Sequence, residues 1–198
     1  MRFVSSAAVL LPVTRPPFLC AAAAAGGEVR LTGVDYRAVS TVALSLAESG
    51  CEVRSEADAV SLCSTGALRS VRPVRTAPYP GFPTDAQPVL MAALLRSEGC
   101  TVFVENIFEN RYRHVDELSR MGAEIRVAGR VAVVNGVRTL HGAAVKCTGL
   151  RGGAALVIAG LSAEGTTRVT ELTHIDRGYD AIERDLAALG AQIRRETT

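Results

Sequence analysis

The hydrophobic pattern of this chain repeats three times. Segments that begin at Gly27, Gly99 and Gly165 each read as a glycine, an alternating strand, a helix, a second glycine and another strand. The two glycines are 23 residues apart in the first two segments and 25 apart in the third. Such self-similarity is typical of a fold built from copies of one supersecondary unit.

Each repeated segment opens with a strand and is preceded by an apolar helix of small residues. Val29 and Leu31 alternate with polar neighbours, which predicts a strand with one face buried under helices. The preceding apolar stretches are FLCAAAAA, AQPVLMAALLRSE and GGAALVIAGLSAE, at residues 18–25, 86–98 and 152–164. The unit is therefore predicted to run helix, strand, helix, strand, with a further strand where the sequence continues, as in RVAVVNG at residues 130–136.

The third segment shows the helical stripe most clearly. Apolar residues follow an i, i+3, i+7, i+10 spacing from Tyr179 to Leu189. Asp176 is placed to cap this helix, and Gly190 stands where a left-handed residue is wanted. After QIRRETT, at residues 192–198, no strand comparable to the earlier ones follows, so we expect an incomplete third unit with an unpaired sheet edge.

These patterns predict an α/β lobe of three units, at about residues 18–70, 71–145 and 146–198. Grouping the units around a common axis puts either the helices inside and the sheets outside, or the reverse. The pattern alone leaves both arrangements open.

Composition narrows the class of protein. The chain is 48% apolar and 21% charged with a net charge of +2, which is ordinary for a globular protein and too small to indicate nucleic-acid binding. No segment reaches the ~18 uninterrupted apolar residues of a membrane span. The five cysteines form no CxxC pair, which favours reduced thiols in the cytosol over a zinc site or a disulfide framework. No metal or organic cofactor is indicated.

Asp85 is the first candidate for chemistry. It follows the stiff segment TAPYPGFPT and opens a predicted helix, where the helix dipole favours an ionised carboxylate. One interpretation is a plain N-cap. The other is a functional carboxylate, because the three prolines fix backbone angles beyond what a cap requires.

Basic residues recur at predicted helix starts. Arginine forks match phosphate and carboxylate oxygens, and arginines at equivalent junctions of successive repeats are expected to converge on a small, multiply anionic substrate. Each of them is alternatively a solvated surface residue, and the histidines are alternatively junction hydrogen-bonding groups. The residues are Arg111, Arg113, His114, Arg151, His174 and Arg177.

Four long motifs, in order, resemble the second half of UDP-N-acetylglucosamine enolpyruvyl transferases. They are RTAPYPGFPTD, FENRYRHVDELSRMGA, LRGGAALVIAGL and AEGTTRVTELTHIDRGYDAIERDLAALGA. The resemblance runs from about residue 18 to about residue 195. The sister family, the 5-enolpyruvylshikimate-3-phosphate synthases, shares the repeat architecture but resembles these motifs less.

The resemblance implies a fold, a reaction and roles. The family fold is an inside-out α/β barrel with two lobes, and the active site lies between them. The family moves the enolpyruvyl group of phosphoenolpyruvate onto the 3′-hydroxyl of UDP-N-acetylglucosamine through a tetrahedral intermediate and releases phosphate. Asp85 matches the aspartate that takes or orients the hydroxyl proton, and Ile107 matches a largely backbone contact to the sugar nucleotide. Arg111, Arg151 and Arg177 match arginines that bind anions and close the domains.

The chain departs from the family in three places. Gly149 stands where the family has an aspartate. Residues 1–17 do not resemble the preceding family segment and are expected to be a poorly ordered, non-family start. The first lobe, which carries a lysine, an arginine and the mobile cysteine loop, is absent, so we expect a cytoplasmic chain that needs this missing partner lobe for activity. The alternatives are the sister synthase and a non-catalytic remnant that binds only sugar nucleotide or a partner lobe.

Overall fold

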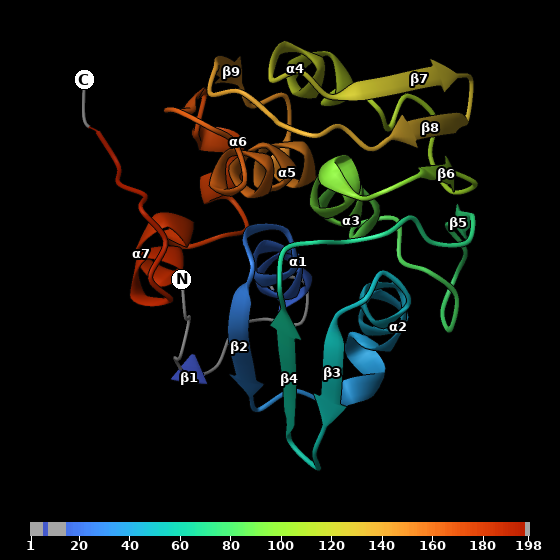
Figure 1. Ribbon diagram of the computed structural model, residues 1–198, viewed down its shortest axis with the longest axis vertical. Helices are drawn as coiled ribbons and strands as arrows, with labels where there is room; N and C mark the ends of the chain where they lie inside the picture. The colour runs from blue at the N-terminus through green and yellow to red at the C-terminus, as the bar shows by residue number, and fades with distance from the viewer. Residues whose placement is uncertain (1–5, 8–14, 197–198) are drawn as a thin grey trace.

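Three helices form the centre of the molecule. The computed structural model describes residues 6–7 and 15–196. Helices α1 (Arg15–Ala25), α3 (Gln87–Ala93) and α5 (Leu150–Leu161) pack against one another, and every residue of α3 is buried (Figure 1). Their alanines and glycines allow the close approach that a densely packed interior requires. The helices are therefore inside, which settles the choice that the sequence pattern left open.

Sheets surround these helices. The first sheet has the order β1-β2-β4-β3 and the second the order β5-β6-β8-β7, whereas the third has only two described strands, β9 and β10. The strands are β1 (Ser6–Ala7), β2 (Gly27–Thr32), β3 (Glu52–Ser55), β4 (Ala59–Ser64), β5 (Val74–Arg75), β6 (Cys100–Val104), β7 (Glu124–Ala128), β8 (Val131–Asn135), β9 (Ala144–Lys146) and β10 (Arg168–Thr170).

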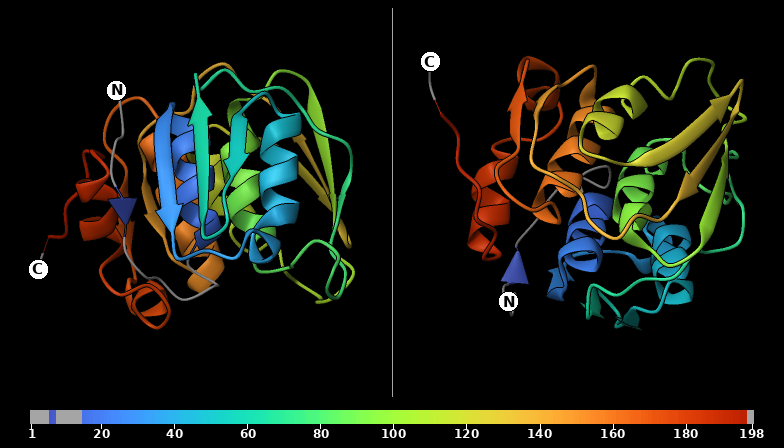
Figure 2. Two further views of the ribbon diagram at one scale, coloured as in Figure 1. Left: turned by 90° about the horizontal axis from the view of Figure 1, so that it is seen from below. Right: turned by 45° about the horizontal axis from the view of Figure 1, so that its top comes forward.

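Further helices complete each unit. In the left view of Figure 2, α1 lies behind strands of the first sheet and α2 lies next to β3, in agreement with the contacts of α1 with β4 and of α2 with β3. These helices and 3-10 turns are η2 (Tyr36–Ala38), α2 (Ser40–Glu48), η3 (Leu94–Arg96), α4 (Val115–Arg120), α6 (Thr173–Asp176) and α7 (Ile182–Ala188). No helix of the described part is long and apolar enough to cross a membrane.

The predicted repeat is present in the first two units, each with one strand more than the sequence pattern indicated. The strand predicted after Gly190 in the third unit is wrong, because residues 191–196 form no strand. A short strand precedes each inner helix and pairs in parallel with the strand that follows it: β1 with β2, β5 with β6, and β9 with β10. These strands are two or three residues long, too short to show a period. The predicted alternation in the first unit is confirmed, because Val29 and Leu31 are buried and Arg30 is exposed.

The continuous helix predicted after Asp176 is wrong. The chain forms two helices, α6 and α7, separated by a break at Ala181, whose φ is 52°. Asp176 ends α6 and pairs with Arg195 at 2.7 Å instead of capping. The apolar stripe still faces the core, and Gly190 has the expected left-handed φ of 93°.

The expected start of the lobe at residue 18 lies inside α1, which begins at Arg15. Of the segment 1–17, residues 6–7 form β1 and residues 15–17 belong to α1. The expected poor order of this segment otherwise falls on residues outside those that the structure describes. All five cysteines are free.

Candidate active site

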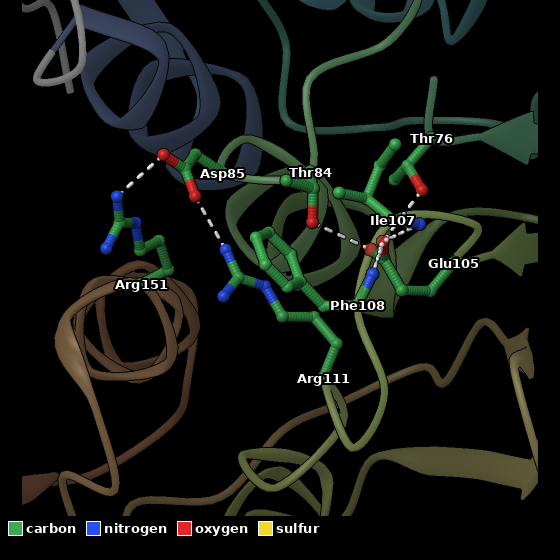
Figure 3. A network of polar contacts seen from close by, with 8 residues as sticks. All are labelled: Thr76, Thr84, Asp85, Glu105, Ile107, Phe108, Arg111 and Arg151. Atoms are coloured by element: carbon green, nitrogen blue, oxygen red, sulfur yellow. Dashed lines mark hydrogen bonds and ion pairs between the residues drawn. The ribbon is translucent and has the colours of Figure 1, made fainter. Parts of the chain in front are cut away.

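One carboxylate lies between two arginines from different units. Asp85 precedes α3, Arg111 lies in the segment that leads into α4, and Arg151 lies in the first turn of α5. Asp85 Oδ1 accepts a hydrogen bond of 2.6 Å from Arg111 Nη2, and Oδ2 accepts one of 2.6 Å from Arg151 Nη2 (Figure 3). The fold thus brings together three predicted site residues that are far apart in the sequence.

The N-cap interpretation of Asp85 is wrong. The residue that precedes α3 is Ala86, and no side chain caps this helix. Both oxygens of Asp85 are instead directed at guanidinium groups, and the side chain is 35% exposed. The carboxylate is therefore available to a site between the units and not used by the helix.

The proline-containing segment that leads to Asp85 is held by short hydrogen bonds. The amide of Ala77 donates to the Phe82 carbonyl at 3.0 Å, and the amide of Gly81 donates to the Pro78 carbonyl at 2.8 Å. The prolines fix φ between these bonds and so lower the conformational entropy of the free loop. Local sequence therefore delivers Asp85 on a stiff turn.

Arg111 is oriented by an aromatic ring. Its guanidinium carbon lies 5.1 Å from the centroid of the Phe108 ring, within cation–π range. Tyr112 anchors the same segment, because its hydroxyl donates to the Phe103 carbonyl at 3.3 Å and to the Arg130 carbonyl at 3.2 Å. Burial raises the pKa of the Tyr112 phenol to about 12, so it stays a neutral donor.

Ile107 offers only part of its backbone to a ligand. Its amide donates to Glu105 Oε1 at 2.9 Å. The side chain is 38% exposed. The Ile107 amide is therefore engaged within the protein.

Arg177 does not join the cluster of Asp85, Arg111 and Arg151. It is exposed at the C-terminal end of α6. Its segment nevertheless borders the cluster: a Cβ at Gly178 would lie 2.7 Å from Leu150, the residue before Arg151. Burial, opposed by the charge of Arg151 and reinforced by that of Asp85, raises the pKa of Tyr179 in this segment to about 12.

The other basic candidates separate into different roles. Arg113 is exposed, and His174 is half-buried in α6. His114 is buried at 2% exposure, and burial, followed by the charge of Arg111, lowers its pKa to about 4. His114 is therefore a neutral imidazole at neutral pH.

Sequence reasoning missed Glu105. This residue follows the last residue of β6, is fully buried, and lies beside Asp85's loop in Figure 3. The signal was an acidic residue directly after a strand whose buried positions alternate. An acid at such a point must be paired or hydrogen-bonded, because an isolated buried charge is costly.

The arrangement is suited to a small anion and a proton transfer. Two guanidinium groups converge on one point, where each has a donor fork that fits phosphate or carboxylate oxygens. Asp85 occupies those donors in this structure. An entering anion would compete for them, and the released carboxylate would then be free to accept a proton from a hydroxyl.

Comparisons with known proteins identify the family of the chain. The family model of EPSP synthase (3-phosphoshikimate 1-carboxyvinyltransferase) matches residues 15–186. The UDP-N-acetylglucosamine 1-carboxyvinyltransferase of Desulfofundulus thermocisternus is 51% identical over 178 residues, which are 90% of this chain and 73% of that protein. The enzyme of the same name from Gluconacetobacter diazotrophicus is 49% identical, and the match covers 42% of its length.

Solved structures show the same fold. The enolpyruvyl transferase NikO from Streptomyces tendae superposes with a TM-score of 0.81 at 29% identity, over 92% of this chain and 43% of that one. EPSP synthase from Acinetobacter baumannii superposes with a TM-score of 0.65 at 20% identity, which bears on the fold alone. The chain therefore belongs to the enolpyruvyl transferase family, on the branch of the UDP-N-acetylglucosamine 1-carboxyvinyltransferases.

Proposed function

We propose that this chain is the catalytic-base lobe of an enzyme that transfers the enolpyruvyl group of phosphoenolpyruvate to the 3′-hydroxyl of UDP-N-acetylglucosamine. The observation that carries the proposal is the Asp85 carboxylate held at 2.6 Å by each of two arginines. A base and two anion-binding groups at one point are what this reaction requires.

The proposed steps follow from these groups. Arg111 and Arg151 bind the anionic groups of phosphoenolpyruvate and release Asp85. Asp85 accepts the proton of the sugar hydroxyl, and the hydroxyl oxygen attacks C2 of phosphoenolpyruvate. At the same time an acid on the opposing lobe adds a proton to C3. The conjugate base of that acid then removes a C3 proton as the C2–O bond to phosphate breaks, and Asp85 returns its proton to the leaving phosphate, which gives the enol ether and inorganic phosphate. The arginines stabilise the negative charge throughout, and Arg177 closes over the anion from its exposed position.

The acceptor is proposed from the relatives. Those named UDP-N-acetylglucosamine 1-carboxyvinyltransferase are 47–51% identical to this chain, whereas the aligned EPSP synthase is 20% identical. The description of the matching family model favours 3-phosphoshikimate as a second candidate acceptor. In the first case the product feeds peptidoglycan synthesis, and we place the reaction in the cytoplasm, where free thiols such as these five persist.

A second lobe is part of the proposal. The chain spans about two-fifths of the length of most of the curated relatives that it matches. The acid must stand across a closed cleft from Asp85, so we expect little turnover from this lobe alone.

Mass spectrometry of the product tests the acceptor. The chain is mixed with the complementary lobe of a relative and with phosphoenolpyruvate, and UDP-N-acetylglucosamine and shikimate 3-phosphate are offered together. We expect the enolpyruvyl adduct of the sugar nucleotide only. The shikimate adduct alone would establish the second candidate, and no adduct from a folded mixture would contradict both.

A further inference from the structure

Glu105 binds four donors with one buried carboxylate. Its residue is fully buried. Oε1 accepts from Thr76 Oγ1 at 2.9 Å and from the amides of Ile107 and Phe108 at 2.9 and 3.1 Å, and Oε2 accepts from Thr84 Oγ1 at 2.9 Å (Figure 3). None of these four partners is charged. A buried carboxylate with this many neutral donors fixes all of them, because each lost bond leaves charge uncompensated.

The four donors lie at both ends of the loop that carries Asp85 and on the turn opposite it. Thr76 begins the loop, and Thr84 immediately precedes Asp85. The loop start is tied a second time, since the Asn106 amide donates to Thr76 Oγ1 at 2.8 Å and Asn106 Nδ2 donates to the Thr76 carbonyl at 3.1 Å. Both ends of the loop are thus held against the turn 105–108.

The same carboxylate also acts on the other half of the ion pair. Phe108, whose amide is held by Glu105, places its ring under the Arg111 guanidinium. Thr84, which Glu105 also holds, is the residue directly before Asp85. Glu105 therefore holds both the base and the aromatic platform of the arginine that contacts the base.

We propose that Glu105 is a positioning residue that fixes Asp85 through Thr84 and Arg111 through Phe108. Its consequence for turnover rests on the proposed function, whereas its effect on the loop does not. The experiment removes the hydrogen bond from the Thr84 hydroxyl to Glu105, which tests the part of the proposal that concerns Asp85.

The experiment compares Thr84→Val, which removes only the hydroxyl, with Thr84→Ser, which keeps it. Hydrogen exchange of the amides between residues 77 and 87 is measured on the full chain, together with kcat and KM for phosphoenolpyruvate in the presence of a complementary lobe. Thr170→Val is the matched control, because Thr170 Oγ1 donates to the Val145 carbonyl at 3.3 Å in the third unit, away from the loop.

We expect Thr84→Val to raise loop exchange about tenfold and to lower kcat about tenfold, with KM changed less than about twofold. Thr84→Ser restores both, and Thr170→Val changes neither. The proposal is overturned if Thr84→Val exchanges and turns over like the parent, or if Thr84→Ser behaves like Thr84→Val. Absence of turnover in the parent contradicts the proposed function alone, because the exchange of the loop still decides on Glu105.

Discussion

Asp85, Arg111 and Arg151 were accessible to sequence reasoning because each stands in a distinctive local context. Proline spacing singled out Asp85, and arginines at predicted helix starts were recognisable as groups that bind anions. That they bind each other was not predictable, since Asp85 and Arg111 meet through the fold of the second unit and Arg151 reaches Asp85 from the third. Glu105 was missed for the same reason: its four partners come from two segments that only the fold brings together.

Replacement of Asp85 with asparagine is expected to tighten the binding of inorganic phosphate. The variant loses both ion pairs and leaves two guanidinium groups for the anion. Since each charge-assisted hydrogen bond contributes about 1.5–3 kcal/mol, we expect the Kd to fall at least tenfold. Titration calorimetry at fixed ionic strength measures it. Weaker binding in the variant would show that Asp85 does not compete with anions.

Burial of His114 is expected to lower the free energy of unfolding as the pH falls. Its pKa falls from an ordinary 6.5 to about 4 in the folded chain, so below pH 6.5 the unfolded chain binds a proton that the folded chain does not. Stability is then complete above about pH 6.5 and is lost as the pH falls toward 4, by up to about 3 kcal/mol. Urea unfolding of the parent and of His114→Gln at pH 7 and pH 4.5 isolates this loss. An equal loss in both proteins would contradict the assignment.

At the scale of elements, periodicity predicted the long helices and the alternating strands, and failed where elements are short or broken. Strands β1, β5 and β9 form because a neighbouring strand provides partners, not because of local propensity. The break between α6 and α7 at Ala181 lies inside an unbroken apolar stripe, so no pattern marks it. Gly190, by contrast, was predicted correctly because a helix end requires a residue that tolerates positive φ.

Gly149 is the residue directly before α5, and no side chain caps this helix. The space that a Cβ at Gly149 would enter is open, with no atom within 4 Å. Its φ of 165° is extended and open to any residue. Gly149→Asp is therefore expected to raise the free energy of unfolding by about 0.5–1 kcal/mol, through an added cap and the helix dipole. Chemical denaturation measures it, with Gly149→Ala as the control that adds volume without a cap. A gain in alanine equal to that in aspartate would exclude capping as the cause.

At the scale of the whole molecule, the three-fold arrangement of units was predictable from the sequence repeat, but the position of the helices inside was not. Helices and sheets both show one apolar face, so pattern alone does not tell which layer is central. Asp85 and Arg151 lie near each other because they stand at the N-terminal ends of α3 and α5, which pack against one another. The architecture therefore takes Asp85 and Arg111 from the second repeat and Arg151 from the third.

The release of phosphate from phosphoenolpyruvate in the presence of UDP-N-acetylglucosamine tests this account most directly. The chain and its Asp85→Asn variant, each shown to be folded, are assayed with the same complementary lobe. We predict turnover by the parent and a rate lower by about 10²–10⁴-fold in the variant, as expected for loss of a general base. Equal rates in the two proteins would contradict the assignment of Asp85 as the base.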